Sequence, residues 1–415
     1  MAVRRAPGIR FETQWPPPAD AMPRMDVAFF AGLAAAGPLH RPVAVESAAQ
    51  YAEVFGGDVP LAWDRVRGEM VYANLSAAIG SFFSNGGHRG WVLRVADAGT
   101  AVANRFPLPG IFDEDGQQAM LAARSEGSWS DGLLVRTVPS PDGRSFELWV
   151  RDAAGAVSRI EQLALDPADP RYWGGLPADR ELFDPGGMRT NPRAVLYATL
   201  WKEAASPRFP LAGADAGPCH AVSFTTSDYF PAEPVAGRPL ERDGLAVFGS
   251  GLFLDPDLAG SGTADLLASA DFIQYQQPQP RPLTGIHAAL AIGEVSLIAA
   301  PDAAHPGWDF VKGVAPPAPP PPDPPPAPDW GRFLPCDFAP PAADAPPPAP
   351  SPPASRYELK ETWQGAALLD VHNALLRMCA ARGDLFAVLS LPVDYRERDA
   401  AAHAGKLTSA FDDRP

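Results

Sequence analysis

Two short runs of carboxylates are the first residues in this sequence that could do chemistry. Asp113, Glu114 and Asp115 form one run, and Asp255 and Asp257 flank a proline in the other. Carboxylate oxygens are the ligands that Ca²⁺ and Mg²⁺ prefer, so each run could bind a cation. Acidic residues beside turn-forming residues are more often part of a solvated turn. We therefore expect turns at both places.

Nucleophiles and other metal ligands lack the spacing that catalysis needs. Neither Ser250 nor Ser261 stands in a Gly-x-Ser-x-Gly turn. The histidines form no His-Glu-x-x-His pair, and no glycine-rich run carries the lysine of a phosphate loop. Cys219, Cys336 and Cys379 are far apart, which fits a reducing compartment and no metal knuckle. The sequence predicts no catalytic residue, no metal, no cofactor and no enzyme.

Composition limits the partners. With 415 residues, 46% of them hydrophobic, the chain can bury a substantial core and form two or three domains. A formal charge of −15 argues against nucleic acid as a partner, because binding phosphates needs a basic face. The apolar stretch 27–36 is too short to span a membrane, and no export signal is evident. We expect no membrane insertion.

The first hundred residues have the pattern of an α/β unit. Residues 27–32 are apolar and predict a buried strand, and Ser47 is a suitable cap for a helix that runs to Phe55. A second helix is expected over 72–84, ending where glycine follows Asn85. Residues 91–95 are rich in β-forming side chains and predict a strand.

The middle of the chain predicts two kinds of strand. Residues 133–138 and 146–150 are short and separated by a Pro-Asp-Gly turn, which is typical of a β-hairpin. Three later runs are continuously apolar, as parallel strands covered on both faces should be: 221–224, 245–248 and 295–300.

A proline-rich tract interrupts the last part of the chain. About half of the positions in 315–353 are proline, which favours a solvated polyproline II spacer of up to roughly 120 Å. Its centre carries four large apolar residues that either dock back on their own domain, our preferred interpretation, or bind a partner: Trp330, Phe333, Leu334 and Phe338. An amphipathic helix over 362–382 and a strand over 385–391 follow the tract.

These patterns predict an α/β fold with a layered, mostly parallel sheet core. The expected organisation is an N-terminal arm (1–24), core segments (25–103, 207–314 and 356–415), an inserted β-rich domain (104–206) and a disordered proline-rich insertion (315–355). In the arm, Ile9, Phe11 and Thr13 alternate as a strand requires, although a disordered terminus is the alternative.

Several short motifs follow one another along the chain: Pro7-Gly8-Ile9-Arg10-Phe11-Glu12, the run 27–57 that ends in Phe-Gly-Gly, Gly86-Gly87 followed by 92–95, the Gly-Ser-Trp element at 127–133, the segment 290–302 that ends in Pro-Asp, and the helix and strand of 372–391. In this order they resemble the contractile tail sheath family of phages and related injection systems. Each motif is weak by itself, and their collinear order carries the resemblance.

The chain departs from the family pattern twice. The proline-rich tract resembles an insertion into a loop that is short in the family. After 406–410 the family continues into a C-terminal domain and arm, whereas this sequence ends at Pro415. We expect the usual C-terminal domain to be missing.

The resemblance implies a structural role. Sheath subunits polymerise as stacked hexameric rings around an inner tube and contract to drive it through a target envelope. Implied partners are further copies of the chain, the tube protein, and baseplate or cap proteins, with assembly in the cytoplasm into a phage tail or an injection particle. The arm with Ile9, Phe11 and Thr13 would join neighbours by strand addition. The alternatives are a sheath-derived accessory or cap protein and, less favoured, an unrecognised α/β enzyme.

Overall fold

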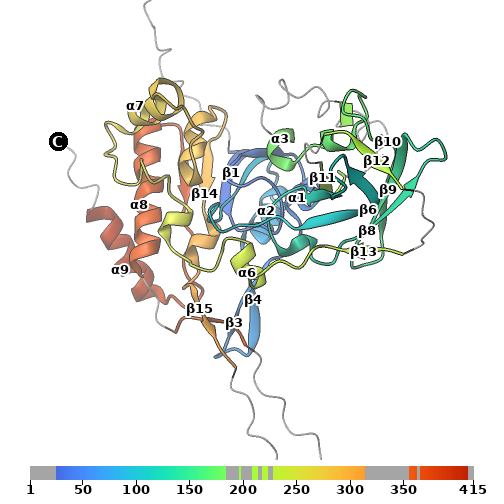
Figure 1. Cartoon of the computed structure of the whole chain (residues 1–415). Helices are drawn as coiled ribbons and strands as arrows, with labels where there is room; N and C mark the ends of the chain where they lie inside the picture. Colours follow the sequence, from blue (N-terminus) through green and yellow to red (C-terminus); the bar gives the residue numbers. More distant parts are fainter. Residues whose placement is uncertain are drawn as a thin grey trace, which may run out of the picture.

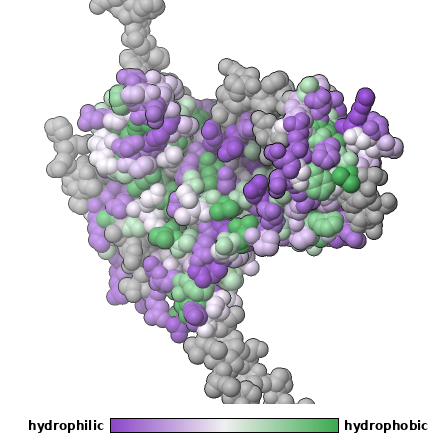
Figure 2. Space-filling view, viewed as in Figure 1, coloured by the Kyte–Doolittle hydropathy of each residue, from purple (hydrophilic) through white to green (hydrophobic). Residues whose placement is uncertain are grey.

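The computed structural model describes residues 25–183, 196–197, 208–213, 217–222, 228–313, 355–361 and 365–409. Figure 1 shows two parts side by side, one built around a sheet with helices on its faces and one made mainly of strands. In Figure 2, hydrophilic residues dominate the outer surface of both parts, with hydrophobic residues in smaller patches between them.

The core is a five-stranded sheet in the order β17-β14-β1-β5-β2. Strands β1, β5, β14 and β17 are parallel, and only β2 runs antiparallel to its neighbour β5. Their bounds are β1 Val27–Gly32, β2 Val43–Val45, β5 Arg89–Arg94, β14 Leu297–Ala299 and β17 Phe386–Val388.

Helices cover this sheet on both faces because its strands are apolar on both. Helices α1 (Ala48–Phe55) and α2 (Leu75–Ser84) pack on one face, and α8 (Gly365–Arg382) packs on the other. The predicted cap of α1 is confirmed, since the Ser47 hydroxyl accepts a hydrogen bond from the backbone N–H of Gln50 at 3.1 Å.

The β-rich part consists of two four-stranded antiparallel sheets, in the orders β10-β9-β8-β13 and β11-β7-β6-β12. The hairpin predicted from 133–150 is confirmed as β8 and β9. A core that includes Phe106, Leu148 and Trp173 lies between the sheets. The bounds are β6 Arg105–Asp113, β7 Gln118–Ala123, β8 Leu134–Pro139, β9 Ser145–Arg151, β10 Val157–Ala164, β11 Leu211–Ala212, β12 Cys219–Ala221 and β13 Phe230–Pro231.

A small fourth sheet, in the order β15-β16-β3-β4, projects from the core (Figure 1). Its strands are β3 Pro60–Asp64, β4 Glu69–Tyr72, β15 Trp308–Val311 and β16 Arg356–Leu359. Strands β15 and β16 pair antiparallel with Val311 opposite Arg356, so the chain leaves for the proline-rich tract and returns from it at adjacent strand ends. That pairing is expected of an insertion into a loop.

Short helices complete the described part of the chain. They are η1 Ser128–Ser130, η2 Trp173–Gly175, α3 Asp179–Leu182, α6 Pro239–Arg242, η3 Ser250–Leu252, α7 Leu266–Asp271, the π-helical η4 Phe272–Gln276, η5 Gly285–Ala291, η6 Pro301–Ala304 and α9 Glu397–Ser409. None of the helices that the structure describes combines the length and the apolar character needed to cross a bilayer.

The mixed α/β content predicted from the sequence is confirmed, but three predicted elements are wrong in part. The helix expected from Tyr72 starts at Leu75, because Tyr72 ends strand β4. Residues 245–248 form bends instead of a strand. Ala221 belongs to β12, which pairs antiparallel with β6 in the β-rich part. Short apolar runs do not reveal which partner they pack against, so periodicity alone could not place them.

The predicted division into domains at residues 24, 103, 206, 314 and 355 stays a prediction. Strands β11, β12 and β13 follow residue 206 and pair with β7, β6 and β8 respectively.

Candidate assembly surface

The core sheet sends alternate side chains of β1 to opposite faces. Val27 and Phe29 point into the core beneath α8, while Ala28 and Phe30 join the cluster beneath α1 and α2. All four are buried. Both faces of the central strand are therefore covered, as its continuously apolar sequence requires.

The outer strand β17 is covered on one face only. Leu385 is buried in the core beneath α8, and Ala387 packs against that core. The side chains of Phe386 and Val388 point to the opposite face, where they are 59% and 47% exposed. Helices α1 and α2 cover the other half of the sheet and leave this half without a helical layer among the described residues.

Strand β14 continues the same apolar surface. In the parallel register Leu297 lies beside Phe386, and Ala299 lies beside Val388. These four side chains share one face of two neighbouring strands. Ala299 is buried and Leu297 half-buried on this face, so the exposed part of the apolar surface lies on β17.

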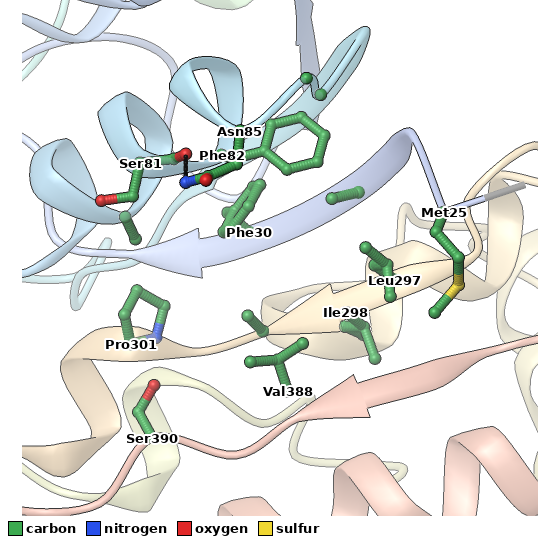
Figure 3. Close-up of a pocket in the computed structure, with 15 residues that line it drawn as sticks. Met25, Phe30, Ser81, Phe82, Asn85, Leu297, Ile298, Pro301, Val388 and Ser390 are labelled. Atoms are coloured by element: carbon green, nitrogen blue, oxygen red, sulfur yellow. Dashed lines mark hydrogen bonds between the residues drawn. The ribbon is translucent and has the colours of Figure 1, made fainter.

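A groove runs between α2 and this uncovered half of the sheet, with a volume of about 420 Å³. Figure 3 shows Phe30 and Phe82 next to each other beneath α2, with Leu297 on β14 and Val388 on β17 beyond them. The Phe30 and Phe82 rings meet edge to face, with centroids 5.4 Å apart. Met25, the first described residue, lines the groove at the start of β1.

None of the described residues that line the groove carries a formal charge. Its lining consists of apolar side chains, glycines and the neutral polar residues Ser81, Asn85 and Ser390. In a chain with a formal charge of −15, an uncharged apolar groove is suited to an apolar segment of another chain or of this one.

The edge of β17 is held from behind by α8. Among the described residues β17 pairs with β14 alone, so its other side is the edge of the sheet. The Cys379 thiol of α8 lies against the backbone N–H of Ala387, and burial raises the pKa of this thiol to about 11. The backbone carbonyl of Ser390 accepts a hydrogen bond from the His372 ring. Both contacts fix the position of the edge strand.

Asp302 lies at the carboxyl ends of the parallel strands β1 and β14. Its carboxylate is fully buried and accepts hydrogen bonds from the backbone N–H groups of Leu33, at 2.7 Å, and Asn74, at 2.5 Å. The His305 ring lies 3.2 Å from the same carboxylate. A Cβ atom on Gly32 would stand 2.5 Å from Asp302 Oδ2, so glycine is required there. Asp302 thereby joins the end of β1 to the first turn of α2.

A buried network joins the core to the β-rich part. The Arg94 guanidinium donates to the backbone carbonyl of Glu126 at 2.9 Å, and the Asp243 carboxylate accepts from the backbone N–H of Ser128 at 2.6 Å. Gly127 between these contacts has φ +118°, a conformation that favours glycine. The Gly-Ser-Trp element therefore serves packing between the two parts.

A second network of charges lies at the end of α1. Asp179, fully buried, is 2.7 Å from the Arg208 guanidinium and 3.6 Å from that of Arg124. Both arginines also donate to backbone carbonyls in the last turn of α1, on Glu53 and Val54. Burial raises the pKa of Asp179, which the attraction of the two arginines opposes. Burial lowers the pKa of Arg208 to about 10.

The predicted interaction residues lie outside the described part of the chain. These are the arm residues Ile9, Phe11 and Thr13 and the tract residues Trp330, Phe333, Leu334 and Phe338. Both sets stay predictions.

The residues weighed for chemistry have structural surroundings. The Asp113 carboxylate accepts a hydrogen bond from the backbone N–H of Gln117 in an exposed turn, as predicted. Ser250 Oγ lies 3.4 Å from an oxygen of Asp370. In the described part of the chain no three His, Cys, Asp or Glu side chains are grouped to hold a metal ion.

The turn predicted at 255–257 is present, but the prediction that Asp255 is solvated there is wrong. This carboxylate is fully buried and binds the Arg281 guanidinium through two contacts of 2.7 Å. The hydroxyl and backbone N–H of Thr284 donate to it as well. Arg281 lies 26 residues away, and no local pattern pairs the two.

Comparison with known proteins gives a distant structural likeness. No protein-family model matches the chain, and no curated protein matches it. A sheath tail protein from Desulfitobacterium hafniense is similar over 74% of this chain and 57% of that one, with 10% identity and a TM-score of 0.26. A sheath tail protein from Listeria innocua is similar over 71% and 52%, with 12% identity and a TM-score of 0.25.

The chain thus spans between half and three fifths of the length of these two proteins. Both TM-scores are well below 0.5, so neither likeness carries a functional conclusion.

Proposed function

We propose that this chain is a structural subunit of a contractile tail sheath, which polymerises with copies of itself around an inner tube. The collinear motifs between Pro7 and Leu391 support the family. The observation that carries the assembly role is the half-covered core sheet, where Phe386 and Val388 expose an apolar face that a parallel sheet normally buries.

The uncovered surface is suited to strand addition. An extended segment placed along β17 would gain main-chain hydrogen bonds from the strand edge and could bury alternate apolar side chains in the groove. The arm fits this description, because Ile9, Phe11 and Thr13 alternate with polar or charged residues. We propose that the arm of one copy occupies the edge and groove of the next.

The same contact repeated from copy to copy would build a tube. A heterologous contact between identical chains generates an open helical array or a closed ring, depending on the rotation between neighbours. A flexible connection through an arm would also let the globular bodies slide while the strand contact persists, as contraction requires. No bond in a substrate is made or broken in this role, so we propose that the chain is not an enzyme.

The finer organisation belongs to the same proposal. We assign 1–24 to the arm, 104–206 to an inserted β-rich domain and 315–355 to an insertion that lies outside the packed core. The remaining segments form the core around the parallel sheet. Partners would be further copies, the inner tube protein and baseplate or cap proteins, in a phage tail or an injection particle that assembles in the cytoplasm.

Negative-stain electron microscopy tests the proposal. The purified full-length protein is imaged alone and together with the inner tube protein of the same particle. Rings or striated tubes are the expected result. Monomers that attach only at the ends of particles would instead support a sheath-derived accessory protein. A protein that stays monomeric under every condition and never attaches to a tube would refute both functions.

A further inference from the structure

Two buried histidines join the last described helix to the core. Nδ1 of His372 on α8 and Nε2 of His403 on α9 are 2.9 Å apart. The two side chains are 1% and 6% exposed, and their rings lie nearly perpendicular with centroids 5.0 Å apart. Within the described ranges no third metal-ligating side chain accompanies them, so they form a hydrogen-bonded pair.

The geometry fixes the protonation state of this pair. The His372 ring already donates a hydrogen bond to the backbone carbonyl of Ser390. Since a neutral imidazole has one N–H and one lone pair, His372 Nδ1 must accept, and His403 Nε2 must donate. A proton added to Nδ1 would bring two N–H groups face to face.

The surroundings oppose a positive charge at this place. Besides burial, His403 disfavours protonation of His372, and Lys406 disfavours protonation of His403. Between β17 and α9, the Tyr395 ring lies 6.2 Å from that of His403, and the Asp399 carboxylate of α9 acts on Tyr395. Burial is the largest cause and lowers the pKa of His372 to about 4.

Two side chains anchor α9 on the core. Of its side chains that the structure describes, His403 and Leu407 are the buried ones, four residues apart on one face. The histidine pair therefore includes one of the two buried side chains of this helix. His372 links the same pair to Ser390, whose side chain lines the groove beside β17.

We propose that His372 and His403 form an acid-sensitive latch, which holds α9 on α8 at neutral pH and releases it when the pair is protonated. Release would also free the Ser390 carbonyl at the end of β17. The latch is independent of the proposed sheath function, because it concerns contacts within one chain.

The direction and size of the effect follow from linkage. A histidine whose pKa is lower in the docked state stabilises docking above its ordinary value of 6.5, and this contribution is lost as the pH falls toward about 4. At pH 5 protonation of His372 alone favours the released state by about 30-fold relative to pH 8. Below pH 4 the effect levels off.

Hydrogen exchange followed by mass spectrometry measures the release of α9 in the full-length protein. The rates are compared between pH 8 and pH 5 after correction for the intrinsic pH dependence of exchange. Peptides from 397–409 should lose protection about 30-fold at pH 5, while peptides from β1 should not. The double substitution His372→Gln and His403→Gln should remove the pH dependence. The exposed His88→Gln is the matched control and should keep it.

A third variant covers the case in which the double substitution releases α9 at every pH. Lys406→Gln leaves both histidines in place and removes a positive charge that opposes protonation, so release should need a more acidic pH. Protection of α9 that is equal at pH 8 and pH 5 in the natural sequence would overturn the proposal. The proposal would also be overturned if the pH at which α9 is released were the same in Lys406→Gln as in the natural sequence and the double histidine variant still released α9 in acid.

Discussion

Replacing Phe386 and Val388 by threonine tests whether the uncovered face of β17 is an assembly surface. Threonine is β-branched and favours strands, so the strand should persist while most of its exposed apolar surface is lost. The two side chains are 59% and 47% exposed, and so about half of each remains to be buried by a partner.

The magnitude follows from those exposures. Full burial of a large apolar side chain stabilises by about 1.5–3 kcal/mol, so the exposed halves of the two side chains together contribute about 2 kcal/mol to an interface. That value corresponds to an association constant about 30-fold weaker for the double variant. The exposed halves of these side chains do not stabilise the monomer, so its thermal stability should change far less than its association.

Sedimentation velocity over a range of concentrations, with electron microscopy of the same samples, measures the change. Val247→Thr is the matched control, since this valine is 80% exposed in the loop between α6 and η3 and far from β17 in the sequence. Assembly at the same concentration in the double variant and in the natural sequence would refute the assignment of this surface. A drop in thermal stability of the isolated monomer would show that the face packs within its own chain.

Three further predictions concern the arm and the two buried carboxylates. Deletion of residues 1–18 should leave the monomer folded, judged by circular dichroism, but abolish polymerisation; unchanged tubes or rings would contradict the role of the arm. Asp302→Asn should destabilise the protein by about 2–4 kcal/mol in denaturant unfolding, because an amide cannot accept from both Leu33 and Asn74 as the carboxylate does; a loss below about 1 kcal/mol would show that Asp302 is not needed to join β1 and α2. Asp179→Asn should cost about 3–5 kcal/mol, because it leaves Arg124 and Arg208 buried without a carboxylate; unchanged proteolysis of the β-rich part would argue against this network as the link between the two parts.

Local patterns in the sequence predicted the elements whose signals are themselves local. The strand 27–32, the Ser47 cap of α1 and the β8–β9 hairpin depend on apolar runs, a hydroxyl at the cap position and turn residues, and all three are confirmed. The helix over 362–382 is confirmed from Gly365 onward, and it ends before Gly383 as expected.

Errors arose where a distant residue decides the outcome. Helix α2 begins at Leu75 and not at Tyr72, because Tyr72 pairs with Pro60 and the backbone N–H of Asn74 donates to Asp302, 228 residues away. Residues 245–248 are apolar without being a strand; Leu245 is buried in the core, and its carbonyl accepts from the Trp308 ring at 2.8 Å.

Composition and periodicity predict the α/β character of the chain, its acidic charge and the apolar nature of β17, because these properties need no reference to a distant partner. The order of strands in the folded sheet left one face of β17 exposed, and the packing of distant segments brought His372 to His403 and Asp255 to Arg281. Strand order and long-range packing leave no periodic signal along the chain, so sequence patterns could not predict them.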